Sequence, residues 1–391
     1  MRRSASKALR FTKIKLQSWR NFTEVDVDLQ RRVFLIGPNA SGKSNFLDVF
    51  RFLRDIVSVG GGFQEAIRRR GGVSKLRCLA ARRYSNIVIH VHIGNGDDEN
   101  VPDWEYELDF NQDKQRRPYI LRERVAKSGS DILRRPDKED VNDPKRRTQT
   151  YLEQVYANQD FRDLADFFRS VHYLHIVPQL IREPDRSIGK SNDPFGGDFL
   201  EQIARTTEKT RNARLRRIVN ALRVAVPQLE ELELQRDIRG TPHLRGKYKN
   251  WRSRGTWQME EQFSDGTLRL MGLLWATLDG NGPLLLEEPE LSLHPEVVRY
   301  IPRIFARVHR RSGRQILFST HSTDLLWDKG IGLDEVLLLL PGEKLGDGTS
   351  IRAVSGIDRI EELLKYGSSL AEVVIPETSP KDAQQLTLWG M

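Results

Sequence analysis

Cysteine and long apolar runs are what this sequence lacks. Cys78 is the single cysteine in 391 residues, which excludes an internal disulfide and a zinc site built on cysteines and fits a reducing compartment. No apolar run approaches the roughly 20 residues of a membrane span. The cationic start, residues 1–7, is not followed by the apolar stretch of a signal peptide. We therefore expect a cytoplasmic protein without a membrane partner.

The chain also lacks heptad patterns and internal repeats, which excludes a long coiled coil. Its cations outnumber its anions, and a formal net charge of +9 permits contact with DNA or another polyanion without proving it. The most suggestive group is Arg245, Lys247 and Lys249, which share one face if this segment is a strand. That face either grips phosphates or is an ordinary solvated face of a hairpin.

One complete motif stands out against these absences. An apolar run at residues 33–36 is followed by a loop of the form G-x-x-x-x-G-K-S: Gly37, Pro38, Asn39, Ala40, Ser41, Gly42, Lys43 and Ser44. Glycines leave the backbone N–H groups open to phosphates, the lysine reaches the β- and γ-phosphates, and the serine hydroxyl offers an oxygen to Mg²⁺. A helical pattern starts at Asn45, so a helix N-terminus should face the anion. The alternative, a glycine-rich turn that matches by accident, is poorly suited to this strand and helix context.

Three further motifs follow in the order that an ATPase requires. Ser264, Asp265 and Gly266 stand where an apolar helix begins, and such a helix start can receive an anion. The apolar run 283–286 ends in Glu287 and Glu288, of which the first can hold Mg²⁺ and the second can orient or deprotonate water. The run 316–318 ends near His321, which can contact the γ-phosphate. Each motif alone could be a cap or a charged strand end, but the ordered set favours function.

The rest of the chain reads as α/β with insertions. Residues 13–29 predict two strands around the turn Trp19, Arg20, Asn21 and Phe22, and residues 87–93 and 104–110 predict a strand pair. Residues 112–150 carry much charge and several prolines, which predicts a mobile insert, and residues 198–226 predict helices of a lid. We divide the chain into an N-terminal lobe (1–111), a polar insert with a helix (112–170), a lid with helices and a basic hairpin (171–262), a C-terminal lobe (263–376) and a tail (377–391).

Two histidines, His90 and His92, fall on one face of the strand predicted at residues 87–93. A metal pair and a solvated face both fit this spacing. The sequence favours the solvated face, since no third ligand stands nearby in the chain.

At these motifs the chain resembles the ABC-class ATPases of the SMC and RecF kind, and more closely the stand-alone ATPases related to the OLD family. The resemblance implies an ABC-type ATPase head, a P-loop NTPase fold of the α/β class with a mixed sheet, a β-rich N-terminal lobe and a helical lid. It makes residues 37–44 the Walker A loop, 264–267 the signature motif, Glu287 and Glu288 the Walker B carboxylates, and His321 the switch histidine. It also places Arg20 near the nucleotide and, by position only, Gln179 on Mg²⁺.

The resemblance implies a homodimer that sandwiches ATP and Mg²⁺ between Walker A of one subunit and the signature of the other. Glu287 replaces the aspartate usual at the first Walker B position, and the signature reads Ser-Asp-Gly-Thr, which argues against a membrane transporter subunit. Lys43, Glu288 and His321 would then serve hydrolysis of the γ-phosphate.

Three readings of the biological role stay open. The first is the sensor or regulatory ATPase of a bacterial anti-phage or genome-defence complex that holds a separate nuclease or toxin effector. The second is a RecF-like repair ATPase acting on DNA, and the third is a nucleotide-gated scaffold with negligible turnover. We do not expect a built-in nuclease, because only about 70 residues follow His321 and none form an Asp-x-Asp pair. We expect the tail, residues 377–391, to dock the effector, although folding back on the core explains its Leu and Trp residues equally well.

Overall fold

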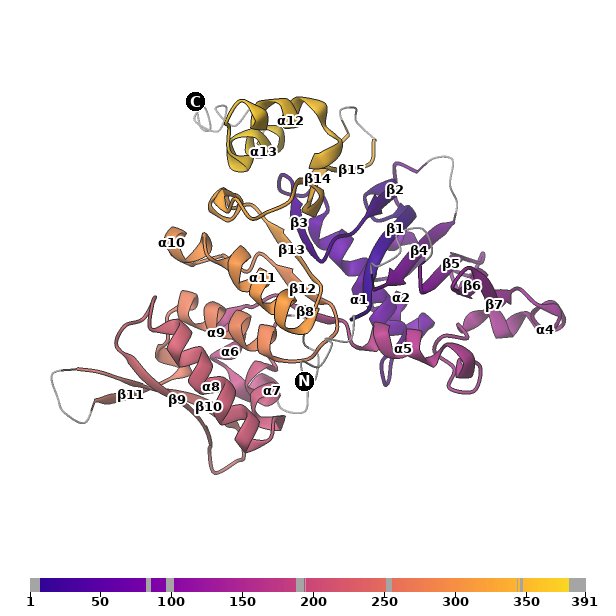
Figure 1. The fold of residues 1–391 in the computed structure, drawn as a ribbon. Coiled ribbons are helices and arrows are strands. Elements are labelled where there is room, and N and C mark those ends of the chain that lie inside the picture. The colour runs from indigo at the N-terminus through magenta and orange to yellow at the C-terminus, as the bar shows by residue number, and fades with distance from the viewer. Residues whose placement is uncertain are drawn as a thin grey trace, which may run out of the picture.

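The computed structural model describes residues 8–81, 86–95, 102–187, 193, 195–250, 255–342, 344 and 347–379. Its strands form three sheets (Figure 1). The first is an antiparallel sheet in the order β2-β1-β4-β5-β6-β7, which we call the antiparallel lobe. Its strands are β1 (Arg10–Trp19), β2 (Phe22–Asp28), β4 (Ile87–Gly94), β5 (Trp104–Gln112), β6 (Pro118–Lys127) and β7 (Ser130–Arg135).

The second sheet, here the central sheet, is mixed and has the order β15-β14-β3-β13-β12-β8. Its strands are β3 (Arg32–Ile36), β8 (His172–Leu174), β12 (Leu284–Glu287), β13 (Ile316–Thr320), β14 (Val336–Leu340) and β15 (Ser350–Ala353). All neighbours pair in parallel except β14 and β15. The carboxyl ends of the five parallel strands therefore meet at one edge, where ligands of α/β proteins bind.

The central sheet separates two hydrophobic cores. Along β3, Val33 and Leu35 pack into the core shared with the antiparallel lobe, and Phe34 and Ile36 pack into the core shared with the lid. Burial on both faces explains why these strands read as continuous apolar runs. The first core also holds α1 (Lys43–Val57), α2 (Phe63–Arg69) and α5 (Arg162–Arg169), with the short α3 (Val73–Leu76) beside them.

The lid and the C-terminal helices cover the other face of the central sheet. The lid holds α6 (Pro178–Ile181), α7 (Phe199–Arg205), α8 (Glu208–Leu222) and a three-stranded sheet of β9 (Leu229–Arg236), β10 (Pro242–Tyr248) and β11 (Thr256–Met259). Behind it lie α9 (Asp265–Leu278), α10 (Pro295–Val298), α11 (Ile301–Ser312), α12 (Asp358–Lys365) and α13 (Leu370–Thr378). No helix within the described ranges is long and apolar enough to cross a membrane.

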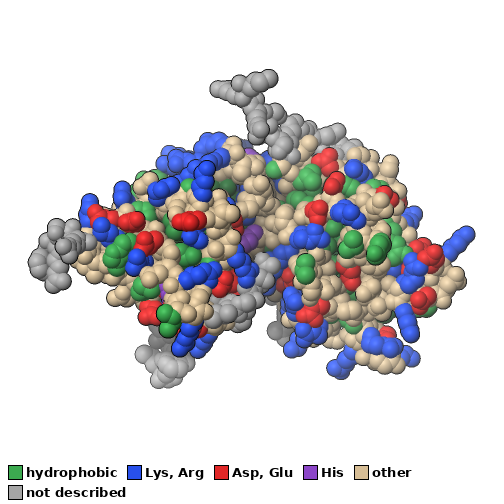
Figure 2. Space-filling view, turned by 90° about the horizontal axis from the view of Figure 1, so that it is seen from below, with side chains coloured by type: hydrophobic (Ala, Val, Ile, Leu, Met, Phe, Trp, Pro, Cys, Tyr) green, Lys and Arg blue, Asp and Glu red, His purple; other side chains and the backbone are tan. Residues whose placement is uncertain are grey.

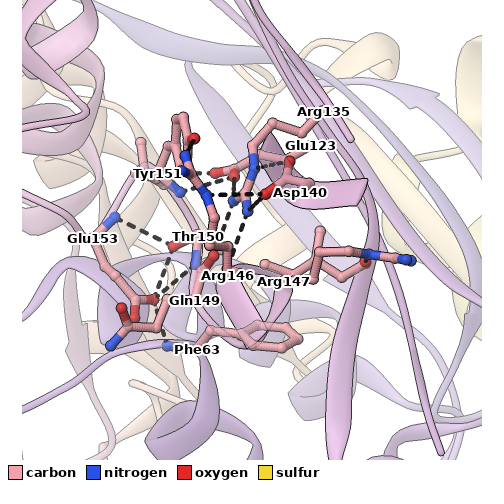
Figure 3. Close-up of polar contacts among 12 residues, drawn as sticks. Phe63, Glu123, Arg135, Asp140, Arg146, Arg147, Gln149, Thr150, Tyr151 and Glu153 are labelled. Atoms are coloured by element: carbon pink, nitrogen blue, oxygen red, sulfur yellow. Dashed lines mark hydrogen bonds and ion pairs between the residues drawn. The ribbon is translucent and has the colours of Figure 1, made fainter. Parts of the chain in front are cut away.

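The expectation of a mobile insert at residues 112–150 is wrong. Strands β6 and β7 extend the antiparallel lobe, and α4 (Lys138–Asn142) folds back on them. The charges that suggested a solvated segment pair across strands, as in Arg122 with Glu107 at 3.1 Å. Others are buried: Arg135 lies between Glu123 and Asp140 beneath Tyr151 (Figure 3). The density of charge therefore marks ion pairing, not disorder.

The apolar segment near the C-terminus is a packed helix. Leu370, Val373 and Val374 of α13 are buried in the core of the central sheet, and Ser369 caps the helix with Glu372. This packing supports the fold-back reading up to Thr378. Nearly all of the tail for which we predicted docking, residues 380–391, lies outside the described residues.

Candidate functional site

The phosphate loop lies where β3 ends and α1 begins, as the motif predicts. Gly42 has φ +98°, a left-handed conformation that favours glycine, and Ala40 has φ 63°. The Lys43 ammonium donates to the carbonyl oxygens of Gly37 and Pro38, at 3.0 Å each, and so arches back over the loop. Burial lowers the pKa of Lys43, while the carboxylates Glu288, Glu287 and Glu290 act in the opposite direction. The lysine therefore faces the acidic end of β12.

The turn between β1 and β2 supports this loop from below, but through Asn21 rather than Arg20. The Asn21 amide donates to the carbonyl oxygen of Ser41 at 2.7 Å, and it accepts from the Asn45 amide at 2.9 Å. A Cβ atom on Gly42 would come within 2.2 Å of the Asn21 nitrogen, so this glycine is required by close approach as well as by φ. The same turn was visible in the sequence, yet nothing there singled out its asparagine.

Arg20 points elsewhere. Its guanidinium pairs with Asp48 of α1 at 3.1 Å. Burial would raise the pKa of Asp48, but Arg70, Arg51 and Arg20 together hold it below its ordinary value. In this structure Arg20 ties the turn to α1, and its contact with nucleotide remains a prediction.

Glu287 sits at the tip of β12 beside the phosphate loop. Its carboxylate accepts one hydrogen bond from the Ser44 hydroxyl and one from the Tyr173 hydroxyl of β8. Burial, and then the charge of Glu287, raises the pKa of Tyr173, which keeps the phenol a donor. His175 lies against the backbone of Glu287, with Nδ1 3.3 Å from the carbonyl oxygen. Ser44 and Glu287 thus bring together two hard oxygen ligands of the kind that Mg²⁺ prefers.

Glu288 points in a different direction, because it has the left-handed φ of 43°. Its N–H donates to the carbonyl oxygen of Ser319 at 3.1 Å, which pins the strand end to β13. Its carboxylate lies 3.2 Å from Nε2 of His321. The hydrogen bond from His321 lowers the pKa of Glu288 despite partial burial. A non-glycine residue held in this conformation at a strand tip is typical of a functional position.

Glu290 is a site residue that the motif analysis did not single out. Its side chain is buried, and one carboxylate oxygen accepts from the Thr320 hydroxyl at 2.5 Å and from the His321 N–H at 3.3 Å. The second oxygen has no hydrogen-bond partner among the described residues. Burial raises the pKa of Glu290 above its ordinary value. Glu290 therefore sets the backbone from which His321 projects.

The predicted signature motif forms a separate part of the surface. Ser264 caps α9, its hydroxyl accepting from the Thr267 N–H at 3.2 Å. Asp265 pairs with Arg182 at 2.5 Å, and a Cβ on Gly266 would lie 2.5 Å from the carbonyl oxygen of Ser292. Across the described part of the chain, no hydrogen bond or ion pair joins the motif to the phosphate loop of the same subunit.

Two more side chains define the surroundings. Gln179, placed on Mg²⁺ by position only, is exposed at the start of α6, and no contact with Ser44 or Glu287 supports that role. Arg269 of α9 lies near the charges of Asp265, Glu288 and Glu290, which oppose the lowering of its pKa by burial. Beside the phosphate loop, a cleft of about 830 Å³ opens between Pro38, His321 and the last turn of α13.

A family of known sequences matches this arrangement. The family model described as "AAA domain, putative AbiEii toxin, Type IV TA system" matches residues 32–327, well over half of the chain. The chain belongs to this family. It is a family of P-loop ATPases, so membership implies binding of ATP with Mg²⁺ and hydrolysis of ATP. Among curated proteins, none matches the sequence.

Solved structures show the same fold at low sequence identity. A structure of an Smc head bound to the C-winged helix domain of ScpA is 12% identical, covering 88% of this chain and 99% of that chain with a TM-score of 0.51. The Smc head with an extended coiled coil from Pyrococcus furiosus, bound to the C-terminal domain of ScpA, is 11% identical over 92% and 100% of the two chains, with a TM-score of 0.49. The SMC head domain from Thermotoga maritima is 14% identical over 88% and 98%, with a TM-score of 0.46.

The fold is therefore that of an SMC-type ATPase head, as the motifs predicted. It has the predicted antiparallel lobe and mixed sheet. The expectation of no long coiled coil also agrees with the structure, since the longest helices within the described ranges, α1 and α8, have 15 residues each.

Proposed function

We propose that this protein binds Mg-ATP in the phosphate loop and hydrolyses it by in-line attack of water on the γ-phosphate. The observation that carries the proposal is the convergence of Lys43, Ser44, Glu287, Glu288 and His321 at one edge of the central sheet. These residues come from three neighbouring parallel strands and one helix start, which is the arrangement that phosphoryl transfer needs.

The roles follow from the directions of the side chains. Lys43 neutralises charge on the β- and γ-phosphates, and its hydrogen bonds to the loop carbonyls are exchanged for bonds to phosphate oxygens. Ser44 and Glu287 would hold Mg²⁺, which withdraws charge from the phosphate oxygens. Glu288 stays ionised at neutral pH and accepts the proton of the attacking water. His321 shares that proton and reaches the γ-phosphate.

We further propose that ATP joins two subunits. The signature residues Ser264, Asp265 and Gly266 are held on α9 and on the loop that follows β12, away from their own phosphate loop. A second subunit can therefore offer this helix start to the γ-phosphate, where its N–H groups would bind the anion. Catalysis then depends on dimerisation.

Three variants test hydrolysis. Glu288→Gln should retain Mg-ATP binding and lose at least about 100-fold in turnover, because the amide keeps the shape without the basicity. Lys43→Ala should lose binding. Glu361→Gln, an exposed glutamate on α12, is the matched control and should behave as wild type. Turnover retained by Glu288→Gln would refute the assignment of the base, and binding without turnover in the wild type would favour the scaffold reading.

Sedimentation tests the dimer. ATP should shift the Glu288→Gln variant towards a dimer, and adding Ser264→Arg should abolish the shift through steric and charge conflict at the helix start. Equal sedimentation with and without ATP would contradict a nucleotide-dependent dimer.

We propose a regulatory role in defence, with a separate nuclease or toxin effector. Support comes from the printed description of the family, which names a toxin of a toxin–antitoxin system. Co-purification from the native host, with and without ATP, followed by identification of the bound protein, tests this role. A partner of DNA repair would favour the RecF-like alternative.

Direct DNA binding by the basic hairpin has less support. Arg245 pairs with Glu233, and Lys247 and Lys249 lie 3.9 and 3.7 Å from Glu230. On the face seen in Figure 2, cations and carboxylates are likewise interspersed over both halves of the molecule. Salt-sensitive DNA affinity that is lost when Arg245, Lys247 and Lys249 are replaced by Glu would restore this reading.

A further inference from the structure

We infer that His90, His92 and Glu105 form a binding site for a divalent transition metal of the Zn²⁺ class on the outer face of the antiparallel lobe. His90 and His92 are two residues apart on β4 and share a face. The register of β4 and β5 sets Glu105 directly opposite His92 and diagonal to His90. One ligand atom from each of the three side chains lies within 4.8 Å of the other two. The neighbouring strand thus supplies the third ligand that the sequence around the histidines lacks.

The two imidazoles are not satisfied by the protein. Nε2 of each ring is buried and has no hydrogen-bond partner among the described residues. The distance of 3.6 Å from Nε2 of His90 to the Glu105 carboxylate is an ion-pair distance, too long for a good hydrogen bond. Buried polar atoms without partners call for an explanation, and a bound ion is one. Burial also lowers the pKa of both histidines, so both rings are neutral and able to coordinate at pH 7.

The donor set favours Zn²⁺ over Mg²⁺ or Ca²⁺, because two imidazoles and one carboxylate suit the former and all-oxygen shells suit the latter. Ligand distances of about 2.0–2.2 Å place tetrahedral donor atoms roughly 3.3 Å apart, so the side chains must close by about 1 Å. Arg124 donates to Glu105 at 2.7 Å and can hold one carboxylate oxygen while the other turns to the metal. Such an outer partner orients a ligand.

The surrounding charges set the expected strength. Lys15 and Lys13 of β1 pair in register with His90 and His92, and with Arg124 they disfavour a cation. Asp26 of β2 pairs with both lysines, at 3.1 and 3.0 Å, and Glu107 lies opposite His90, so much of this charge is compensated. We therefore expect moderate affinity, at a site that ties β4 to β5.

Titration of the full chain, freed of metal with EDTA, tests the inference. Co²⁺ should give visible absorption bands of a low-coordinate site at one ion per chain, and Zn²⁺ should displace it. His92→Ala and Glu105→Gln should each weaken Co²⁺ binding at least about tenfold, as the loss of a ligand requires. Two controls should bind as wild type does. Glu107→Gln is the neighbouring carboxylate outside the cluster, and Glu287→Gln removes the phosphate-loop carboxylate.

Circular dichroism should show all four variants folded. His92→Ala leaves the pair of Glu105 with Arg124 intact, so it provides the decisive comparison if Glu105→Gln unfolds. Absence of stoichiometric Co²⁺ binding, or equal affinity in His92→Ala and wild type, would overturn the site. The readout is the metal itself, so its failure would leave the proposed ATPase function untouched.

Discussion

Arg135 should be the residue of the antiparallel lobe whose loss costs most. It is 1% exposed and lies between the buried carboxylates of Glu123 and Asp140, with distances of 3.0 and 2.7 Å. It also donates to the carbonyl oxygens of Arg146 and Gln149, at 3.0 and 2.9 Å. Arg135→Met keeps most of the volume and removes every one of these bonds. Two buried carboxylates are then left without a counter-ion.

The cost can be bounded from the contacts. Breaking a buried ion pair by removing one partner costs about 3–5 kcal/mol. Glu123 keeps three other donors, the backbone N–H groups of Tyr151 and Leu152 and the Tyr106 hydroxyl, so we expect about 3 kcal/mol. For a cooperative unit of 150–250 residues this lowers Tm by about 6–12 °C. Burial already raises the pKa of Glu123, so in the variant this carboxyl should take up a proton. The loss should therefore be smaller at pH 5 than at pH 8.

Thermal unfolding followed by circular dichroism measures the loss, and limited trypsin digestion locates it. Cleavage in residues 136–150 should become faster, since Arg135 joins this segment to β6. Arg134→Met is the matched control, because its side chain is 75% exposed and its pair with Asp131 is long at 3.7 Å. That control should change stability by less than about 0.5 kcal/mol. Equal Tm values for the two variants, or a loss that grows on acidification, would refute the reasoning.

Three other perturbations test the site and its supports. Asn21→Ala should weaken ATP binding about tenfold with turnover at saturation retained, because it frees the carbonyl of Ser41; unchanged affinity would make Asn21 a spectator. Glu290→Gln should lower turnover about tenfold at unchanged ATP affinity through its bonds to Thr320, and full turnover in a steady-state assay would contradict this. Burial, then Arg314, lowers the pKa of His172 from 6.5 to about 4, so the unfolded chain binds the extra proton between these values and the wild type loses stability as pH falls. His172→Leu should thus gain about 1–2 kcal/mol relative to wild type between pH 7 and pH 5 in urea unfolding, and a constant difference would refute the assignment.

The chemistry of the site could be read from the sequence because its signals are local. A phosphate loop needs glycines and a lysine at fixed spacing, and β3 and α1 flank it as predicted. The same holds for Glu287 and Glu288 after an apolar run, since the two carboxylates follow directly from the end of β12. Even the fold class follows from such runs, because continuous apolar strands indicate a sheet covered on both faces.

The antiparallel lobe was predicted less well, because charge was taken as a sign of solvent. Proline misled in the same way: Pro118 begins β6, and Pro136 directly follows β7. Both are positions where a missing N–H is tolerated. Composition describes a segment by itself, whereas the cross-strand pair of Arg124 with Glu105 exists only once β5 and β6 lie side by side.

The residues that support the site could not have been predicted, because their partners are remote in the chain. Gln315 shows why: its amide donates to the carbonyl oxygen of Phe11, 304 positions away, and accepts from the N–H of the same residue. It therefore acts as a piece of strand for β1 just before β13 begins. Asn21 does the same for the phosphate loop, donating to Thr349 as well as to Ser41. A glutamine or asparagine in a sequence carries no mark of such a role, since the same side chain on a surface would bond to water. A pattern can therefore identify the groups that perform the chemistry, whereas the groups that hold them in place become visible only when distant segments are brought together.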